Sequence, residues 1–512
     1  MCLHAFRRNK VAGAFIAATL LLSSAQADYE LADLNGIWSI HGVVGGADPN
    51  VPGSFYMTGT VDTTGGTTVT DYGDSQGISA MSWADNTVDL ALSGGGIVTL
   101  SGDDAPFRGV MNWEDEDFVV SVGTVAPGPD TGVGGDGLWA WVKQSATPTF
   151  SQSDGAGTWW LHGLYFSDDS WGSWSRGQLQ VDTIGNVSFV PGTFANSDGD
   201  ANTPPDGTTT ISSYGYVGFS YDPNMHGIMN LDKDLIVFSM PETDGGSLNI
   251  MQKHSPSVTF STADMVGNWH MYELGAELEM GTATWGYGMM EIDSDGSLQG
   301  VELNSFGETD TFSVTFSIDN DGVITLAEDS DTHGTMSDDK DMIVIVSGDG
   351  SDWASLIVLV RAVASPLYRF WSPGNLRHFY TISLAERLHV EATWPDVWTY
   401  EGEVSYAFPQ NIEEGLVPVY RFWSPTMLAH FYTISESEKT DIETNWPDAW
   451  TYEGTVFYAF PSALENSIPV YRFWSPTFLT HFYTISESEK NNVEATWPDD
   501  WTYEQIAWYA YE

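Results

Sequence analysis

Short runs of β-branched and aromatic residues, separated by turns rich in Gly, Asp and Ser, recur along most of the chain. Within many of these runs apolar and polar residues alternate, which is the pattern of a strand with one buried face. Long stretches of helical periodicity are absent. The pattern therefore predicts an all-β, multi-domain protein with a few short helices.

The last third of the chain contains one passage three times. Each copy reads Tyr-Arg-Phe-Trp-Ser-Pro, then His-Phe-Tyr-Thr, then Trp-Pro-Asp and Trp-Thr-Tyr-Glu, and its histidine recurs after 52 and then 51 residues. A fixed period of this length indicates one supersecondary unit whose copies bury faces against each other. We place this module at residues 365–512, with repeats at about 366–417, 418–468 and 469–512.

Each copy carries four short aromatic runs that we interpret as strands. In the second copy these runs are Val419–Trp423, His430–Ile434, Trp450–Tyr452 and Phe457–Phe460. Between the second and third runs, Ser435 and Glu438 form a capping-box pattern that predicts a helix start, and the later Trp-Pro pair predicts its end. Twelve strands with pseudo-threefold symmetry suit a β-trefoil-like module with short helices. A three-bladed or prism-like arrangement is the alternative.

This repeated motif resembles an uncharacterised tandem-repeat domain, a family of unknown function found at the ends of secreted microbial proteins, often beside hydrolase or peptidase domains. The resemblance implies an accessory module that binds carbohydrate or a cell surface. The third copy departs from the pattern, because Glu401-Gly402 and Glu453-Gly454 become Glu504-Gln505. We interpret this position as a turn, and expect any site in the third copy to be the weakest.

The start of the chain has the pattern of a secretory signal peptide. A basic segment precedes an apolar run at residues 11–22, and Ala25-Gln26-Ala27 follows. We predict cleavage after Ala27, so that residues 1–27 are removed, and the apolar run is too short for a stable bilayer anchor. The expected location is secreted, with the periplasm as the alternative. The sole cysteine, Cys2, would leave with the signal, so no disulfide is expected.

The formal net charge of −53 narrows the classes of partner. A surface this acidic repels nucleic acid and anionic membranes, so we expect neither nucleic-acid binding nor membrane insertion.

Residues 28–147, 148–258 and 259–364 form three homologous units that share four markers in one order. The first marker is Gly-x-Trp, at Trp38, Trp159 and Trp269, and the last is a strand that ends in a cation, at Lys143, Lys253 and Arg361. The order of runs and Asp-Gly turns predicts a meander in each unit. The units weakly resemble lipocalin-like and avidin-like small barrels, with small sandwiches as the alternative. They form either three separate barrels or one fused pseudo-threefold body, and we expect the three tryptophans to be core plugs.

Two further patterns concern chemistry. Asp-x-Asp-Gly occurs at Asp293–Gly296 and Asp319–Gly322, but an EF-type loop from Asp293 would need a glutamate where Asn304 stands, so we interpret these segments as hairpin turns. We predict no cofactor and no metal site, with adventitious calcium as the alternative. The mature part has no thiol for catalysis, and we assign no catalytic residue.

Binding is the function that the sequence favours, because aromatic faces and a few fixed polar groups are what a glycan site needs. Each repeat offers such a set, and a glycan or cell-surface polymer is the expected partner. The candidate residues are Trp371, His378, Tyr400 and Glu401; Trp423, His430, Tyr452 and Glu453; and Trp474, His481, Tyr503 and Glu504. The alternative is a structural role in which the repeated arginines Arg369, Arg421 and Arg472 pair with these glutamates. Two other functions stay open: a secreted hydrolase with an unrecognised N-terminal catalytic unit, and small-ligand binding in the barrels.

Overall fold

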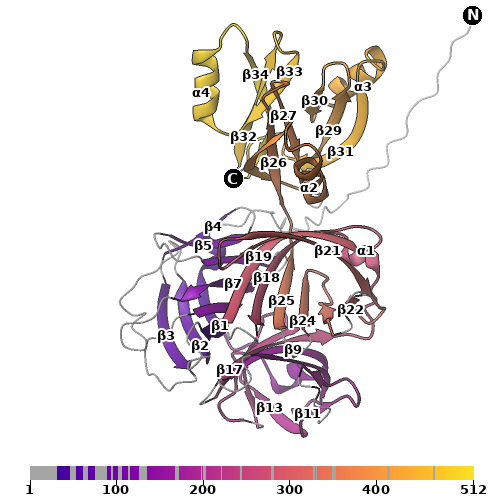
Figure 1. Cartoon of the computed structure of the whole chain (residues 1–512). Helices are drawn as coiled ribbons and strands as arrows, with labels where there is room; N and C mark the ends of the chain where they lie inside the picture. Colours follow the sequence, from indigo (N-terminus) through magenta and orange to yellow (C-terminus); the bar gives the residue numbers. More distant parts are fainter. Residues whose placement is uncertain are drawn as a thin grey trace, which may run out of the picture.

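The computed structural model describes most of the chain after residue 30. The described residues are 31–46, 53–61, 67–74, 89–93, 96–101, 107–112, 116–125, 135–167, 172–197, 199, 203–220, 222–242, 245–277, 282–326, 329, 331–348, 353–411, 415–464 and 467–511. The predicted signal peptide lies outside them. Among these residues no helix combines the length and the apolar character that a bilayer crossing requires. Strands dominate, as predicted, in an N-terminal body with a smaller C-terminal module beside it (Figure 1).

Unit 1 is a single antiparallel sheet of eight strands in the order β3-β2-β1-β8-β7-β6-β5-β4. The first and last strands of the meander are hydrogen-bonded neighbours, as in a barrel. Its elements are η1 (Leu31–Leu34), β1 (Gly36–Gly46), β2 (Gly53–Val61), β3 (Thr67–Asp74), β4 (Asp89–Leu92), β5 (Ile97–Ser101), β6 (Phe107–Met111), β7 (Phe118–Val125) and β8 (Gly135–Lys143).

Unit 2 follows the same meander, and an additional pairing between β10 and β11 closes its ring of strands. A short strand, β12, is added at the side of β10. The elements are η3 (Gln152–Gly155), β9 (Gly157–Ser167), β10 (Ser173–Val181), β11 (Asn186–Phe189), β12 (Ala195–Asn196), β13 (Gly207–Ile211), β14 (Tyr216–Phe219), β15 (His226–Met229), β16 (Leu235–Glu242) and β17 (Gly245–His254).

Unit 3 is a closed eight-stranded barrel. Both Asp-x-Asp-Gly segments form hairpin turns here, between β19 and β20 and between β21 and β22, with Gly296 and Gly322 at positive φ. The elements are α1 (Thr262–Met265), β18 (Gly267–Glu277), β19 (Thr282–Ile292), β20 (Ser297–Asn304), β21 (Thr309–Ile318), β22 (Val323–Leu326), β23 (His333–Met336), β24 (Met342–Ser347) and β25 (Trp353–Arg361).

One tryptophan at an equivalent position in each unit plugs one end of that unit, as predicted. Trp38, Trp159 and Trp269 are fully buried. Each indole N–H donates to a carbonyl of the short helix before the first strand, at 2.7 to 2.8 Å. The cation at the end of the last strand lies over the ring, 5.5 Å from its centroid for Lys143 and 4.2 Å for Arg361. The cation–π contact and the hydrogen bond together explain why Trp and a basic residue recur as a pair.

The barrels are fused into one body, which was the second of the two predicted arrangements. One hydrophobic cluster contains buried side chains from all three units, among them Leu138, Leu164 and Leu274. Each unit also has its own interior cluster, which contains its tryptophan. The strands that face both clusters are buried on both sides, and burial of this apolar area holds the units together.

The repeat module contains three three-stranded sheets, one per repeat, so the predicted four strands per repeat is wrong. The third and fourth aromatic runs belong to one strand. The elements are β26 (Ser365–Ser372), β27 (Arg377–Thr381), α2 (Leu384–Thr393) and β28 (Thr399–Ala407) in repeat 1; β29 (Val417–Ser424), β30 (Ala429–Thr433), α3 (Glu436–Asn445) and β31 (Thr451–Ala459) in repeat 2; and β32 (Ile468–Ser475), β33 (Thr480–Thr484), α4 (Glu487–Thr496) and β34 (Thr502–Ala510) in repeat 3. Among the described strands, isolated bridges are the only backbone pairing between different repeats, which is the three-bladed alternative and not a shared trefoil barrel.

A ring of three tyrosines marks the pseudo-threefold axis of the module. The hydroxyl of Tyr380 donates to the carbonyl of Tyr483 at 2.8 Å and accepts from its backbone N–H at 3.1 Å. Tyr483 makes the same two bonds with Tyr432, and Tyr432 makes them with Tyr380. All three rings are buried. The ring satisfies every hydroxyl while it fixes the position of the three inner strands.

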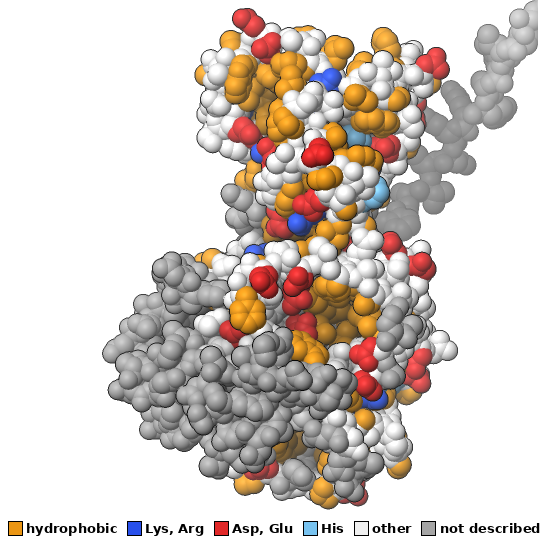
Figure 2. All heavy atoms as spheres, viewed as in Figure 1, with side chains coloured by type: hydrophobic (Ala, Val, Ile, Leu, Met, Phe, Trp, Pro, Cys, Tyr) orange, Lys and Arg blue, Asp and Glu red, His pale blue; other side chains and the backbone are white. Residues whose placement is uncertain are grey.

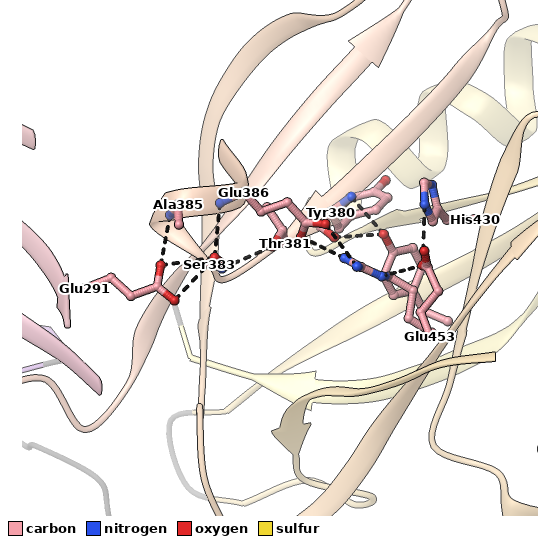
Figure 3. Close-up of polar contacts among 10 residues, drawn as sticks. Glu291, Tyr380, Thr381, Ser383, Ala385, Glu386, His430 and Glu453 are labelled. Carbon is pink, nitrogen blue, oxygen red and sulfur yellow. Dashed lines mark hydrogen bonds and ion pairs between the residues drawn. The ribbon is translucent and has the colours of Figure 1, made fainter. Parts of the chain in front are cut away.

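The module contacts unit 3 through repeat 1, whose helix α2 is the one nearest the body in Figure 1. The carboxylate of Glu291 on β19 accepts from the hydroxyl of Ser383 at 3.0 Å and from the N–H of Ala385 at 2.8 Å (Figure 3). A carboxylate at a helix N-terminus is favourable, because free N–H groups point at it. Repeat 1 has Leu384 where the other repeats have Glu436 and Glu487, and this leucine is buried in the contact.

Candidate binding site

The predicted tryptophan and histidine of each repeat form a cross-strand pair. Trp371 on β26 lies opposite His378 on β27, and their ring centroids are 4.7 Å apart. The same pair recurs as Trp423 with His430 at 4.6 Å and as Trp474 with His481 at 4.8 Å. The backbone pairing of two adjacent strands therefore positions both rings.

The predicted glutamate joins this pair from the third strand. Glu401 lies at a β-bulge within β28, where the register with β26 shifts. Its Oε2 atom lies 3.4 Å from Nε2 of His378 and 2.8 Å from Nε of Arg369. Equivalent contacts link Glu453 and Glu504 to the histidine and arginine of their own repeats.

The segment that we interpreted as a turn is this bulge, so that interpretation is wrong. Gly402 and Gly454 follow the bulged glutamate with φ values of 112° and 119°. Gln505 takes the same place in the third repeat without a positive φ, and the register shift is retained. Glu504 still lies 2.9 Å from Arg472 and 3.4 Å from His481. The third cluster is therefore intact, and its lower affinity stays a prediction.

The predicted tyrosine does not join the cluster. Tyr400 lies on the other face of the sheet, with its ring 5.3 Å from that of Phe370 and under the guanidinium of Arg387. Tyr452 and Tyr503 are placed in the same way, each against a phenylalanine and a lysine. Each candidate site therefore contains Trp, His, Glu and Arg, and the tyrosines support the helices from behind.

Sequence reasoning missed a second glutamate, which comes from the neighbouring repeat. The guanidinium of Arg421 binds Glu386 through two nitrogens, at 2.8 and 3.0 Å, while its Nε binds Glu453 (Figure 3). Arg472 binds Glu438 in the same two-nitrogen manner, and Arg369 binds Glu489 through one nitrogen at 3.1 Å. Three arginines thus join the three repeats in a cycle of ion pairs.

These second glutamates are the ones that the capping-box pattern identified. The serine half of the box forms: the hydroxyl of Ser435 accepts from the N–H of Glu438 at 3.2 Å. The carboxylate, however, turns to the arginine of the next repeat. Because a capping box is a local pattern, it predicts the helix start correctly but does not reveal the partner across the repeat boundary.

The charges of the cluster follow from its burial. Burial, and then the charge of Arg421, lowers the pKa of His430 to about 3, and burial also lowers the pKa of His481. Burial opposes ionisation of Glu401 and Glu504, but the hydrogen bond from the histidine and the nearby arginine outweigh it and lower both pKa values. For Glu453 burial prevails and the pKa is raised. At neutral pH the clusters of the second and third repeats therefore offer a neutral imidazole beside an arginine.

The clusters are half-buried. The three tryptophans keep part of their surface exposed, and the Nδ1 atoms of His430 and His481 have no hydrogen-bond partner among the described residues. Buried polar atoms are normally hydrogen-bonded, so this unused capacity needs an explanation. These nitrogens are themselves enclosed, so the accessible part of each cluster is a half-open indole beside a partly exposed carboxylate, which suits a ligand with an apolar face and hydroxyl groups.

Exposed apolar side chains surround these clusters in equivalent places. The tip of each β-hairpin carries a leucine with positive φ, and Leu376, Leu428 and Leu479 are 40%, 48% and 47% exposed. The tips of repeats 1 and 2 adjoin, since Nε of Arg377 donates to the carbonyl of Met427. Positive φ is unusual for leucine and points to a functional reason. In the part of the chain that the structure describes, no three His, Asp or Glu side chains are grouped to hold a metal.

Comparison with known proteins identifies only the repeat module. Residues 366–511 match the family described as Domain of unknown function (DUF5648), which confirms the resemblance to an uncharacterised domain. No curated protein matches the chain.

Several solved structures match more distantly. A protein of unknown function from the DUF3598 family of Nostoc punctiforme is 13% identical, covers 41% of this chain and 98% of its own, and has a TM-score of 0.16. Transferrin binding protein B of Haemophilus parasuis is 10% identical, with coverages of 64% and 76% and a TM-score of 0.22. Kievitone hydratase of Nectria haematococca is 9% identical, with coverages of 67% and 94% and a TM-score of 0.18. TM-scores this low do not define a shared fold.

Proposed function

We propose that this is an exported, non-catalytic binding protein whose repeat module binds a glycan or a cell-surface polymer. The observation that carries the proposal is the half-open cluster of Trp371, His378 and Glu401, which recurs with the same contacts in all three repeats. A polymer made of repeating units suits a surface with repeated sites, because linked contacts raise the effective concentration of each site for the next unit.

The rigidity of the clusters supports the same proposal. Arg369 fixes Glu401 from within the repeat, and its second contact with Glu489 fixes the repeat against its neighbour. A site that is already ordered before binding loses little conformational freedom when the ligand arrives. The exposed Trp394, Trp446 and Trp497, at the ends of the three helices, add aromatic surface beyond the clusters.

The experiment uses the full chain and a panel of insoluble polysaccharides and cell-wall preparations. Depletion of the protein from solution is measured for the unmodified chain and for a variant with Trp371→Ala, Trp423→Ala and Trp474→Ala combined. We expect the polymer that depletes the unmodified protein to retain much less of the triple variant. Tyr214→Ala is the matched control, because Tyr214 is an aromatic side chain, 44% exposed, on unit 2.

Equal retention of the triple variant and the control would contradict the proposal. Release of soluble sugar or peptide from the polymer would instead favour the hydrolase alternative.

A further inference from the structure

The interior of unit 3 contains acidic residues on strands that are otherwise apolar. On β18, Trp269 and Met271 belong to the interior cluster, while Tyr272 and Leu274 belong to the cluster shared between units. Side chains alternate between the faces of a strand, so Glu273 faces the interior. By the same alternation Glu302 faces inward with Leu298 on β20, and Ser355 faces inward with Leu359 on β25.

This interior is filled at one end and open at the other. Trp269, Leu298 and Leu359 have no exposed surface at all. Further along the same strands Glu273, Glu302 and Ile357 keep some solvent-accessible surface, although they face into the barrel. In Figure 2 a hollow floored by hydrophobic side chains opens over the barrel of β18–β25, with acidic side chains along its edge. The barrel therefore has accessible space beside its two glutamates.

The two glutamates approach each other across a glycine. Gly286 on β19 is the register partner of Glu273, and a Cβ at Gly286 would come within 1.4 Å of Oε1 of Glu302. The carboxylate of Glu302 therefore lies over this glycine and reaches towards Glu273. Burial, and then repulsion from Glu302, raises the pKa of Glu273 well above its usual range. Two like charges at this depth are unfavourable, so one of the two carboxyl groups retains a proton unless a positive charge joins them.

A serine adds a second observation that points to a ligand. Ser355 is fully buried and lies beside Glu273, and its hydroxyl has no hydrogen-bond partner of normal geometry among the described residues. Such a group is rare in a folded interior, and a ligand is one of its ordinary explanations.

Unit 2 has the same barrel fold and shows which residues occupy the position of Glu273 there. Four residues after its buried tryptophan it has Gly163 where unit 3 has Glu273. The space over Gly163 is occupied by Asn249, whose amide donates to Ser247 at 2.7 Å. The equivalent region is therefore neutral and hydrogen-bonded. The acidic pair therefore has no counterpart at this level of unit 2.

We propose that the open end of the unit 3 barrel binds an organic cation with an apolar body, such as an alkylamine. The ammonium group would lie between Glu273 and Glu302 and donate to the carboxylates, with the Ser355 hydroxyl beside it. Trp353 lies over Gly275 and Phe312 lies over Gly300, so aromatic rings flank this part of the barrel. Aromatic faces attract cations, and the half-buried Ile357 offers apolar surface for the body of the ligand. An organic cation fits better than a metal ion, because the described residues contain no group of three metal-ligating side chains.

This inference is independent of the proposed function of the repeat module, and the full chain serves to test it. Hexylamine, hexanol and hexanoate are titrated by calorimetry at neutral pH, because they share the alkyl chain and differ in charge. We expect saturable binding of hexylamine, much weaker binding of hexanol and none of hexanoate. Glu273→Gln and Glu302→Gln should each weaken hexylamine binding about tenfold or more, because a charge-assisted hydrogen bond is lost. Both variants remove a repelled carboxylate, so folding should be retained, which the melting temperature checks.

Asp295→Asn is the matched control, because it removes a fully exposed carboxylate from the β19–β20 turn of the same barrel. Hexylamine should bind this variant as it binds the unmodified chain. The inference is overturned if hexylamine does not bind saturably, if hexanol binds equally well, or if both glutamine variants bind as the control does.

Discussion

The N-terminal body and the repeat module both contain three copies of one unit around a shared apolar core, but the polar interactions that join the copies differ. In the body, the barrels meet through apolar outer faces that form one shared core, and buried polar groups such as His162 and His333 pair inside it. In the module, three tyrosines meet at the axis and three arginines pair with glutamates across the repeat boundaries. Threefold repetition therefore does not determine how the copies associate. The side chains at the boundary do.

The largest effect should come from the tryptophan plugs of the body. Trp269→Ala empties a fully buried site and removes the hydrogen bond to Met265, so we expect a loss of about 3–5 kcal/mol in the free energy of unfolding of unit 3. Trp371→Ala in the module should cost clearly less, because Trp371 is half-buried. Denaturant unfolding followed by hydrogen exchange of each region measures both. A larger loss for Trp371 would assign that residue to the core and withdraw it as a ligand contact.

A smaller effect should come from the ion pairs of the module. Arg421→Ala leaves Glu386 and Glu453 without their shared partner, and we expect a loss of about 1–3 kcal/mol, since all three groups keep some contact with solvent. Arg421→Lys is the control, because lysine retains the charge but cannot bind two oxygens in the same planar manner. In denaturant unfolding of the module, the free energy of unfolding should be highest for the unmodified chain, lower for the lysine variant and lowest for the alanine variant. An alanine variant as stable as the unmodified chain would show that these ion pairs add nothing to the apolar core and the tyrosine ring that join the repeats.

The smallest of these effects should come from the helix caps. Ser435→Ala removes the hydroxyl that accepts from the N–H of Glu438, and we expect a loss of about 1 kcal/mol. Ser383→Ala should cost more than this, since Ser383 also donates to Glu291 of the body. Thermal unfolding of the two variants compares a cap within the module with one at its contact to the body. Equal losses would mean that the hydrogen bond from Ser383 to Glu291 adds nothing to the stability.

The sequence patterns predict the local features of both regions, and they do so for physical reasons. Gly-x-Trp together with a cation at the end of the last strand predicts a buried tryptophan whose ring contacts that cation. Ser-x-x-Glu predicts a helix start. The sequence also contains a signal of the fused body. Met342–Val346 is an unbroken apolar run, and all of its residues are buried. Such a run is typical of a strand with both faces covered, whereas a separate barrel would alternate.

The candidate site was predicted less well, because two of its features depend on geometry that the repeat motif does not encode. Tyr400 and Glu401 are adjacent, so in a strand they point to opposite faces, and only the glutamate joins Trp371 and His378. Glu386 enters the site of the next repeat, and no local pattern identifies a partner 35 residues away.

The difference between the two regions is tested most directly by raising the pH. Burial, and then the charges of Asp232 and Asp234, raises the pKa of Asp117 in the body to about 7 from 3.8. The pKa of Glu273 is raised as well. The folded body therefore holds protons that the unfolded chain has released, and its stability falls as the pH rises towards these folded pKa values. In the module the pKa values of Glu401, Glu438 and Glu504 are lowered, so their contribution is fully present above about 4.5 and is lost only in acid.

The measurement is hydrogen exchange of the full chain between about pH 7 and about pH 8.5, where a histidine with the ordinary pKa of about 6.5 is mostly deprotonated, corrected for intrinsic exchange rates. The account predicts that the opening free energy of β7 falls across this range and that Asp117→Asn removes much of the fall. The opening free energy of β33, where His481 contacts Glu504, should stay constant. An equal fall in both strands, or a fall in β33 alone, would contradict the view that the body buries protonated carboxyl groups while the module keeps its carboxylates ionised beside arginine.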